Sequence, residues 1–215
     1  VKSGAVTLST ETESILQKSY MAILAREASQ QEEIEYIRNT FEKENIKFMF
    51  LKGTHLKVLY PLPEMRFMVD MDILVKEKCL DTAKKNLISQ GFKIKINSSK
   101  DVVLIKEPFL TIELHKMLFV EDYFMHNYFT SVWNKAVAVN NYEYKMSYND
   151  LYIYTLAHLA EHYLEAGSCF RPLMDLYLME KSYNDLDFTY INEQFKELGI
   201  DKFAEKIKQL CQRCS

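Results

Sequence analysis

Asp70 and Asp72 are the residues of this sequence best suited to hold a divalent cation. They lie in a run whose apolar residues alternate with polar ones, so both carboxylates are expected on one face of a β-strand. Two carboxylates placed in this way can chelate one hard divalent cation or bridge two, and phosphoryl transfer uses this arrangement. Glu113, on the polar face of a later predicted strand, is the candidate for a third ligand. The alternative is that both aspartates are solvated on an exposed sheet face, because Asp-x-Asp is common by chance.

A second group of residues is suited to bind phosphate. Lys52-Gly53-Thr54 follows a short apolar run and precedes a predicted helix. Gly53 would let a phosphate approach the backbone, and the first amide groups of the helix would face the anion. Lys52 and Arg66 add cationic groups, and Arg66 lies four residues before Asp70. A turn glycine and a surface charge are the plainer interpretation of each residue alone, but their order favours a phosphate site beside the cation site.

A third pattern indicates a different chemistry. His158, Glu161 and His162 match H-x-x-E-H, the motif of zinc peptidases in which two histidines one helical turn apart bind the metal. The third zinc ligand would have to be Asp175 or Glu180. The favoured interpretation is that these are polar residues on a helix face that looks toward a cleft or a partner helix, where His158 and His162 could contact a substrate.

Two further side chains are candidates for contact with a substrate. His115 shares the polar strand face of Glu113, so it would touch substrate or orient that carboxylate. Arg171 precedes Asp175 by one helical turn, and such pairs are most often surface ion pairs. Because Arg171 also stands at the start of a predicted helix, it could instead face the substrate.

The composition is that of an ordinary globular protein and argues against several functions. The 215 residues are 48% hydrophobic and 27% charged, with a formal net charge of −3. Without an excess of positive charge, the chain has no global attraction to nucleic acid or to anionic membranes. Only 5 glycines occur, and neither G-x-G-x-x-G nor G-x-x-x-x-G-K-S/T is present. A glycine-rich phosphate-binding loop is therefore not expected.

The cysteines predict a reducing compartment. No secretory signal or apolar run of membrane-spanning length precedes Cys79, Cys169, Cys211 and Cys214, so the cytoplasm is the expected location and no membrane partner is expected. Cys211 and Cys214 form a C-x-x-C pair, but no second pair and no nearby histidine pair completes a zinc site.

Apolar periodicity divides the chain into three regions. An N-terminal helical segment (1–44) is expected to start with a capping box from Thr10 to Glu13 and would become two helices if it breaks at the polar stretch around Ser29. An α/β lobe (45–120) has predicted strands at 46–51, 69–75, 102–106 and 109–115 and helices at 54–60 and 77–90. A mainly helical lobe (121–215) has a predicted hairpin around Asn140 and helices at 148–165, 172–182, 188–198 and 201–213. The fold class is therefore α+β, with a small mixed β-sheet flanked by helices followed by a C-terminal helical bundle lobe.

These residues resemble the uncharacterised nucleotidyltransferases of the polymerase-beta-like superfamily. The resemblance is carried by Phe50-Leu51-Lys52-Gly53-Thr54, Tyr60-Pro61, Arg66-x-x-x-Asp70-x-Asp72-Ile73-Leu74-Val75, Gly91-Phe92 and Ile112-Glu113-Leu114-His115. It covers residues 45–120 closely and the helical remainder more loosely. The resemblance implies that the Gly53-Thr54 turn matches the superfamily's Gly-Ser phosphate motif, with threonine in place of serine. It also implies that Asp70, Asp72 and Glu113 match its three acidic positions.

The activity that the resemblance implies is transfer of a nucleoside monophosphate from a nucleoside triphosphate to the hydroxyl of an unidentified acceptor. The expected cofactors are Mg²⁺, as two ions, and a nucleotide, with ATP favoured. Asp70 and Asp72 would hold Mg²⁺, while Glu113 would ligate the metal or take the acceptor's proton. Lys52 and Arg66 would hold the β- and γ-phosphates.

Three alternatives compete with this function. The first is a toxin-type nucleotidyltransferase that acts on RNA, which the acidic balance disfavours, although local basic patches such as Lys84-Lys85 exist. The second is a catalytically silent nucleotide-binding module, against which the presence of all three carboxylates argues. The third, and the least favoured, is the zinc peptidase.

Overall fold

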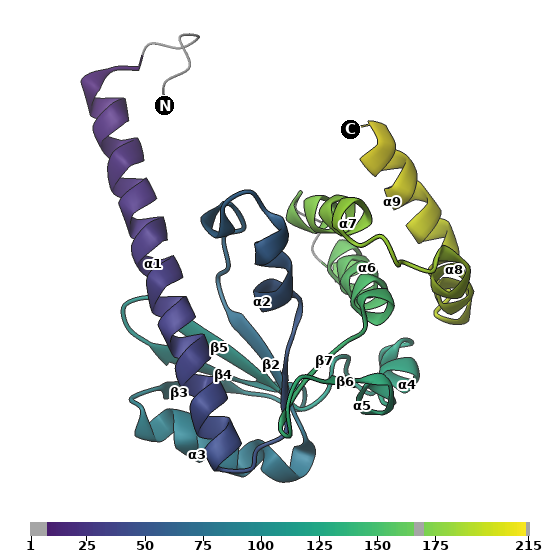
Figure 1. The fold of residues 1–215 in the computed structure, drawn as a ribbon, viewed down its shortest axis with the longest axis horizontal. Helices are drawn as coiled ribbons and strands as arrows, with labels where there is room; N and C mark the ends of the chain where they lie inside the picture. The colour runs from purple at the N-terminus through teal and green to yellow at the C-terminus, as the bar shows by residue number, and fades with distance from the viewer. Residues whose placement is uncertain (1–7, 166–169, 214–215) are drawn as a thin grey trace.

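A mixed β-sheet forms the centre of the molecule in the computed structural model, which describes residues 8–165 and 170–213 (Figure 1). In these residues the sheet has seven strands in the order β3-β4-β5-β2-β1-β7-β6. The strands are β1 (Phe48–Phe50), β2 (Met71–Val75), β3 (Lys93–Asn97), β4 (Asp101–Lys106), β5 (Leu110–His115), β6 (Val137–Ala138) and β7 (Glu143–Lys145). The predicted fold class, a small mixed sheet with flanking helices and a helical C-terminal region, is confirmed.

Two long-range pairings decide the shape of the sheet. Strand β2 pairs in parallel with β5 and antiparallel with β1, so two segments about 40 residues apart in the chain lie side by side. Strand β7 then pairs in parallel with β1. The hairpin predicted around Asn140 is confirmed as β6 and β7, and it extends the sheet built by the preceding residues.

Strand β3 was not predicted, although its sequence alternates lysine and isoleucine. All five of its residues are exposed, and it pairs only with β4 at the edge of the sheet. A short edge strand with charged residues buries little apolar surface, so the hydrophobic pattern in its sequence is weak. Its lysines also discourage pairing with another chain at this edge.

The N-terminal segment is one unbroken helix, α1 (Thr10–Lys43), so the break considered at Ser29 does not occur. The helix is capped one residue earlier than predicted, because the Ser9 side chain accepts a hydrogen bond from the Thr12 amide. Its C-terminal half packs on the sheet, whereas its N-terminal half extends beyond it (Figure 1). Although α1 has 34 residues, none of the helices in the described ranges is both long and apolar enough to cross a membrane.

Two hydrophobic cores lie on opposite faces of the sheet. Alternation along β1 sends Phe48 and Phe50 into the core shared with α1 and α3 (Leu80–Ser89), and Met49 into the core shared with the C-terminal helices. Helix α3 ends before Gly91, whose φ of 94° is the left-handed conformation predicted for the helix end. The central strands β1 and β2 therefore contribute side chains to both cores.

The predicted C-terminal helices are confirmed to within one residue. They are α6 (Tyr148–Glu165), α7 (Arg171–Ser182), α8 (Phe188–Glu197) and α9 (Asp201–Arg213). Two short helices that periodicity did not predict, α4 (His126–Phe129) and α5 (Val132–Lys135), precede them, because four residues are too few to show a helical period. Cys169 and Cys214 lie outside the described residues.

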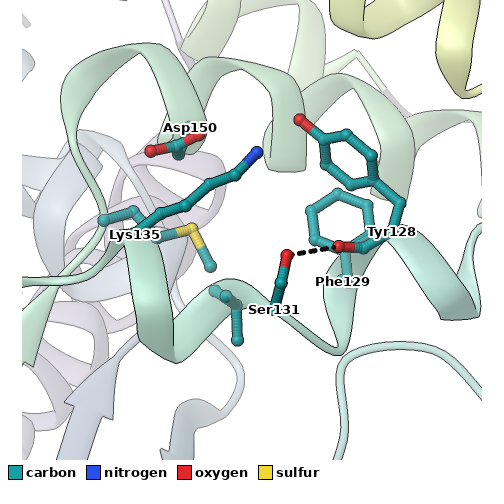
Figure 2. Close-up of a pocket in the computed structure, with 7 residues that line it drawn as sticks. Tyr128, Phe129, Ser131, Lys135 and Asp150 are labelled. Carbon is teal, nitrogen blue, oxygen red and sulfur yellow. Dashed lines mark hydrogen bonds between the residues drawn. The ribbon is translucent and has the colours of Figure 1, made fainter.

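A small pocket beside α4 and α5 illustrates how tightly this lobe is packed (Figure 2). Its volume is about 10 Å³, and Lys135, one of the residues that line it, has its Nζ 4.7 Å from the centre of the Tyr128 ring. A volume of this size holds at most about one water molecule. The pocket is a packing defect rather than a site for a ligand.

Candidate active site

A polar cleft of about 440 Å³ lies between the sheet and helices α6 and α7. Most of the side chains that the sequence singled out are brought together in it. It is lined by Lys52, Arg66, Val69, Asp70, Asp72, Glu113, Thr155, His158, Leu159, His162, Arg171, Pro172 and Asp175. Carboxylates from the sheet thus face histidines and an arginine from the helical lobe.

The parallel pairing of β2 and β5 forms the acidic centre of this cleft. The register places Asp72 directly beside Glu113. His115, at the end of β5, brings its Nε2 to 2.9 Å from Asp72 Oδ1 and 3.7 Å from Glu113 Oε2. Ligand atoms of Asp72, Glu113 and His115 all lie within 4.8 Å of one another, so these three residues could hold a metal ion.

Asp70 lies in the same cleft but just before the first residue of β2. The sequence predicted Asp70, Asp72 and Glu113 as the metal ligands, whereas the three closely grouped side chains include His115 in place of Asp70. The hydrogen bond to Asp72 shows that His115 supports the acidic centre directly. The expectation that His115 orients a carboxylate agrees with this contact, but its partner is on the neighbouring strand.

The pKa values of the two aspartates are shifted in opposite directions. Burial, followed by the charge of Asp72, raises the pKa of Asp70. Burial also opposes ionisation of Asp72, but the hydrogen bond from His115 and the nearby charge of Lys52 outweigh it and hold its pKa below the usual range. Asp72 is therefore the fixed negative charge of the site.

Glu113 gives the site a pH dependence that can be measured. Burial and the charges of Asp72 and Asp70 raise its pKa to about 7. A metal ion requires the ionised carboxylate, so Mg²⁺ affinity is expected to be roughly tenfold tighter at pH 8 than at pH 6. Isothermal titration of MgCl₂ at the two pH values measures this, and Glu113→Gln should remove most of the difference. If the Mg²⁺ affinity of Glu113→Gln changes with pH as much as that of wild type, Glu113 is not the group responsible for the pH dependence.

The raised pKa of Glu113 also affects the stability of the fold. Stability is expected to fall as the pH rises, whereas Mg²⁺ affinity is expected to increase. Because the pKa of Glu113 is higher in the folded state than in the unfolded chain, folding favours the protonated form. This stabilisation is present below the pKa of about 4.5 that Glu113 has in the unfolded chain, and it is lost as the pH rises through about 7. Without metal, the free energy of unfolding should therefore fall over this range, and the fall should be smaller in Glu113→Gln.

Lys52 supplies positive charge on the sheet side of the cleft. It is the first residue of α2 (Lys52–Leu56), and its Nζ lies 5.5 Å from the centre of the buried Tyr154 ring. Burial lowers the pKa of Lys52 to about 8, while the charges of Asp72 and Asp70 oppose this decrease. Lys52 is thus mostly charged at neutral pH, so little free energy is needed to charge it before it pairs with an anion.

Gly53 and Thr54 are placed differently from the other predicted site residues, since neither lines the cleft. Gly53 is buried, and a Cβ atom there would lie 2.8 Å from the Sδ atom of Met68. The Thr54 hydroxyl is buried and has no hydrogen-bond partner among the described residues. In this structure Gly53 therefore serves close packing of α2, and the role of both residues toward phosphate stays a prediction.

Arg66 is engaged in a buried ion pair that the sequence did not indicate. Its Nε and Nη2 donate to the two carboxylate oxygens of Asp175, each at 2.7 Å, and both side chains are about 96–97% buried. The Tyr60 hydroxyl donates to the same carboxylate at 2.8 Å. The expectation of a surface pair between Arg171 and Asp175 is wrong, because Asp175 points to Arg66 across the interface between the lobes. No local pattern could reveal a pair separated by 109 residues.

The H-x-x-E-H residues lie on α6 at the edge of the cleft. His158 and His162 bring their Nε2 atoms to 3.2 Å from each other, a spacing that two ligands of one metal ion can have, but the carboxylates that a zinc peptidase needs are engaged elsewhere. The Glu161 carboxylate, which would be the general base, is bound to Lys100 at 3.1 Å. Asp175 and Glu180, the candidate third ligands, accept hydrogen bonds from Arg66 and from a tyrosine. Burial and the charge of Lys52 keep the pKa of His158 well below its usual value.

Comparison with solved structures defines the class of this fold as nucleotidyltransferase-like. The antibiotic-resistance factor ANT(2'')-Ia superposes with a TM-score of 0.54 at 9% identity, covering 86% of this chain and 96% of the other. The Megavirus polyadenylate synthase gives 0.48 at 13% identity over 85% of this chain and 39% of that one. An antigenic nucleotidyltransferase-like protein from Paracoccidioides brasiliensis gives 0.41 at 12% identity, over 66% and 70%.

The sequence places the chain more narrowly than the fold does. Residues 2–215 match the family described as "Uncharacterised nucleotidyltransferase", and the chain belongs to this family. None of the curated proteins matches it. The resemblance seen in residues 45–120 is therefore confirmed and extends through the helical lobe, and the chain is an enzyme of the nucleotidyl-transfer class.

Proposed function

We propose that this enzyme uses Mg²⁺ to transfer a nucleoside monophosphate, with ATP as the favoured donor, to the hydroxyl group of an acceptor. The observation that carries the proposal is the register of β2 and β5, which sets Asp72 beside Glu113 in a cleft that also contains Asp70 and cationic side chains. Carboxylates next to cations suit a triphosphate that arrives with its metal.

The donor set fits Mg²⁺. Asp70, Asp72 and Glu113 offer carboxylate oxygens, which this hard cation prefers, while the nearby His115 nitrogen is better suited to hold Asp72 in place. Two ions are expected, because three carboxylates exceed what one Mg²⁺ with its waters needs. When bound, the metal would neutralise phosphate charge and stabilise the charge that develops during transfer.

The protein side chains have separable tasks in this proposal. Lys52 and Arg171 would bind the β- and γ-phosphates, since both line the cleft and neither forms an ion pair with another of the described residues. Arg66 would contribute less to phosphate binding than the sequence suggested, because two of its nitrogens already donate to Asp175. Its remaining Nη1 lies 3.4 Å from the Gly53 carbonyl and would position the turn beside the phosphates. Glu113 would either ligate the metal or accept the proton of the attacking hydroxyl, because its carboxylate lies beside Asp72 in the cleft.

Titration of ATP in the presence of MgCl₂ tests the nucleotide and metal assignments. Wild type should bind ATP in a Mg²⁺-dependent way, and the double variant Asp70→Asn, Asp72→Asn should lose at least about tenfold in affinity, because the metal loses two charged ligands. The control Asp81→Asn removes one carboxylate charge from a residue on α3 whose side chain is 79% exposed, and it should bind as wild type does. Equal affinity in the double variant would overturn the proposal.

A further inference from the structure

Two histidines of helix α6 line the cleft but have no task in the proposed reaction. His158 and His162 are one helical turn apart, so their side chains lie on the same face of the helix. Both line the main cleft and also an adjoining cavity of about 300 Å³. A small ligand that enters either space therefore reaches both rings.

The spacing of the two rings suits joint binding of one metal ion. Their Nε2 atoms are 3.2 Å apart, and the ring centres are 4.2 Å apart. Two nitrogens that each lie about 2.0–2.1 Å from a tetrahedral Zn²⁺ are about 3.3–3.4 Å from each other. The two nitrogens are thus already close to the separation that a shared metal requires. Without metal, one ring donates a hydrogen bond to the other, and a bound metal would take the place of that hydrogen.

The surroundings of His158 keep its ring in the form that ligates metals. The ring packs edge-on against the buried ring of Tyr154, one turn earlier in α6, with the ring centres 6.0 Å apart. Because burial and the charge of Lys52 hold the pKa of His158 well below its usual value, the ring is neutral at pH 7. His162 is exposed, so its side chain can adjust to a metal that His158 has bound.

The donor atoms distinguish this pair from the carboxylate centre on the sheet. Imidazole nitrogens suit Zn²⁺ and Ni²⁺, whereas Mg²⁺ prefers carboxylate oxygens. Lys100, the one cationic side chain that lines the adjoining cavity, has its charge offset by Glu161 at 3.1 Å. Glu113 lines both spaces together with the histidines, and its carboxylate would reduce the electrostatic cost of placing a cation there.

We propose that His158 and His162 form a binding site for a transition-metal cation, with Zn²⁺ as the ion that fits, separate from the carboxylate site for Mg²⁺. Two protein ligands leave coordination positions for water, and the two cavities have room for several water molecules. The inference goes beyond the proposed function and does not depend on it. Neither histidine is among the residues proposed to bind Mg²⁺ or phosphate.

Nuclear magnetic resonance of the histidine rings tests the site directly. The full chain, without a polyhistidine tag, is labelled with ¹⁵N-histidine, saturated with MgCl₂ and titrated with ZnCl₂. We expect the Nε2 signals of His158 and His162 to move together and to reach a limit at about one equivalent of zinc. If zinc leaves both signals unshifted, the inference is wrong. A response confined to His115, which lies beside Asp72 and Glu113, would place the zinc in the carboxylate centre and would also overturn it.

Two histidine variants test whether the pair acts as a chelate. Because His162 is exposed, His162→Gln should fold as wild type does, and we expect it to weaken zinc binding at least about tenfold in isothermal titration. The matched control His126→Gln removes a histidine that lines neither space, and it should bind zinc as wild type does. Equal zinc affinity in His162→Gln and wild type would contradict the site.

The double variant Asp70→Asn, Asp72→Asn separates this inference from the proposed function. It removes carboxylates of the Mg²⁺ site and should still show the zinc response of His158 and His162. Loss of that response would mean that zinc depends on the carboxylate centre, and the inference would be wrong. If wild type fails to bind ATP with Mg²⁺ while zinc shifts both histidines, the proposed function is wrong and the zinc site is supported.

Discussion

Replacing Asp72 with asparagine is expected to lower the rate of nucleotidyl transfer by about 10²–10³-fold, equivalent to roughly 3–4 kcal/mol of transition-state stabilisation. The amide keeps the size of the side chain but removes a cleft carboxylate whose pKa is held below its usual range. It also replaces the charged partner of His115. The rate is measured as transfer of label from α-labelled ATP into an acceptor fraction of a cell extract.

The control for this prediction is the loss of an equivalent charge elsewhere. Asp81→Asn, on exposed α3, should transfer label at the wild-type rate. Circular dichroism should show that Asp72→Asn is still folded at the assay temperature, although it loses some stability because the fold favours the ionised form of Asp72. A rate in Asp72→Asn above about a tenth of wild type would contradict a role for this residue as the principal metal ligand.

Replacing Asp175 with alanine is expected to lower the free energy of unfolding by about 3–5 kcal/mol, since it leaves the buried charge of Arg66 without a partner. The Tyr60 hydroxyl loses its acceptor at the same time. For a chain of this length the melting temperature should fall by roughly 6–20 °C. Chemical denaturation followed by circular dichroism measures the free energy.

A double variant distinguishes loss of the pair from loss of packing. Arg66→Met combined with Asp175→Leu removes both charges and fills similar volume, so it should recover most of the stability that Asp175→Ala loses. Arg66→Met alone should be strongly destabilising, because it buries an unpaired carboxylate. If Asp175→Ala costs less than about 1 kcal/mol, the ion pair does not hold the two lobes together.

Local patterns predicted most elements because the forces that form them act over short stretches of chain. Alternation identified β2 and β5, and helical periodicity identified α6 and α7 to within a residue. Weakly buried elements such as β3 escaped prediction, since an edge strand with lysines has little apolar signal. The continuity of α1 through Ser29 was equally hidden, because packing of the neighbouring residues against the sheet stabilises the helix there.

The acidic centre was predictable for a similar reason. Asp70 and Asp72 are neighbours in sequence, and Glu113 was recognised because its strand shows the same alternation. That Glu113 lies beside Asp72 depends on the parallel register of β2 with β5, which links segments about 40 residues apart. The hydrogen bond of His115 to Asp72 follows from this register and could not be derived from either strand alone.

The sequence by itself determined the family and the fold class, and it supplied the residue types that we propose to bind metal and phosphate. Only the tertiary structure decided which charged side chains are available to bind a ligand. It neutralises Arg66 with Asp175 and Lys100 with Glu161, and it leaves Lys52 and Arg171 facing the cleft. The physical reason is that an ion pair forms between side chains that packing brings within about 3 Å, whatever their separation in the chain, so composition and spacing carry no record of the partner.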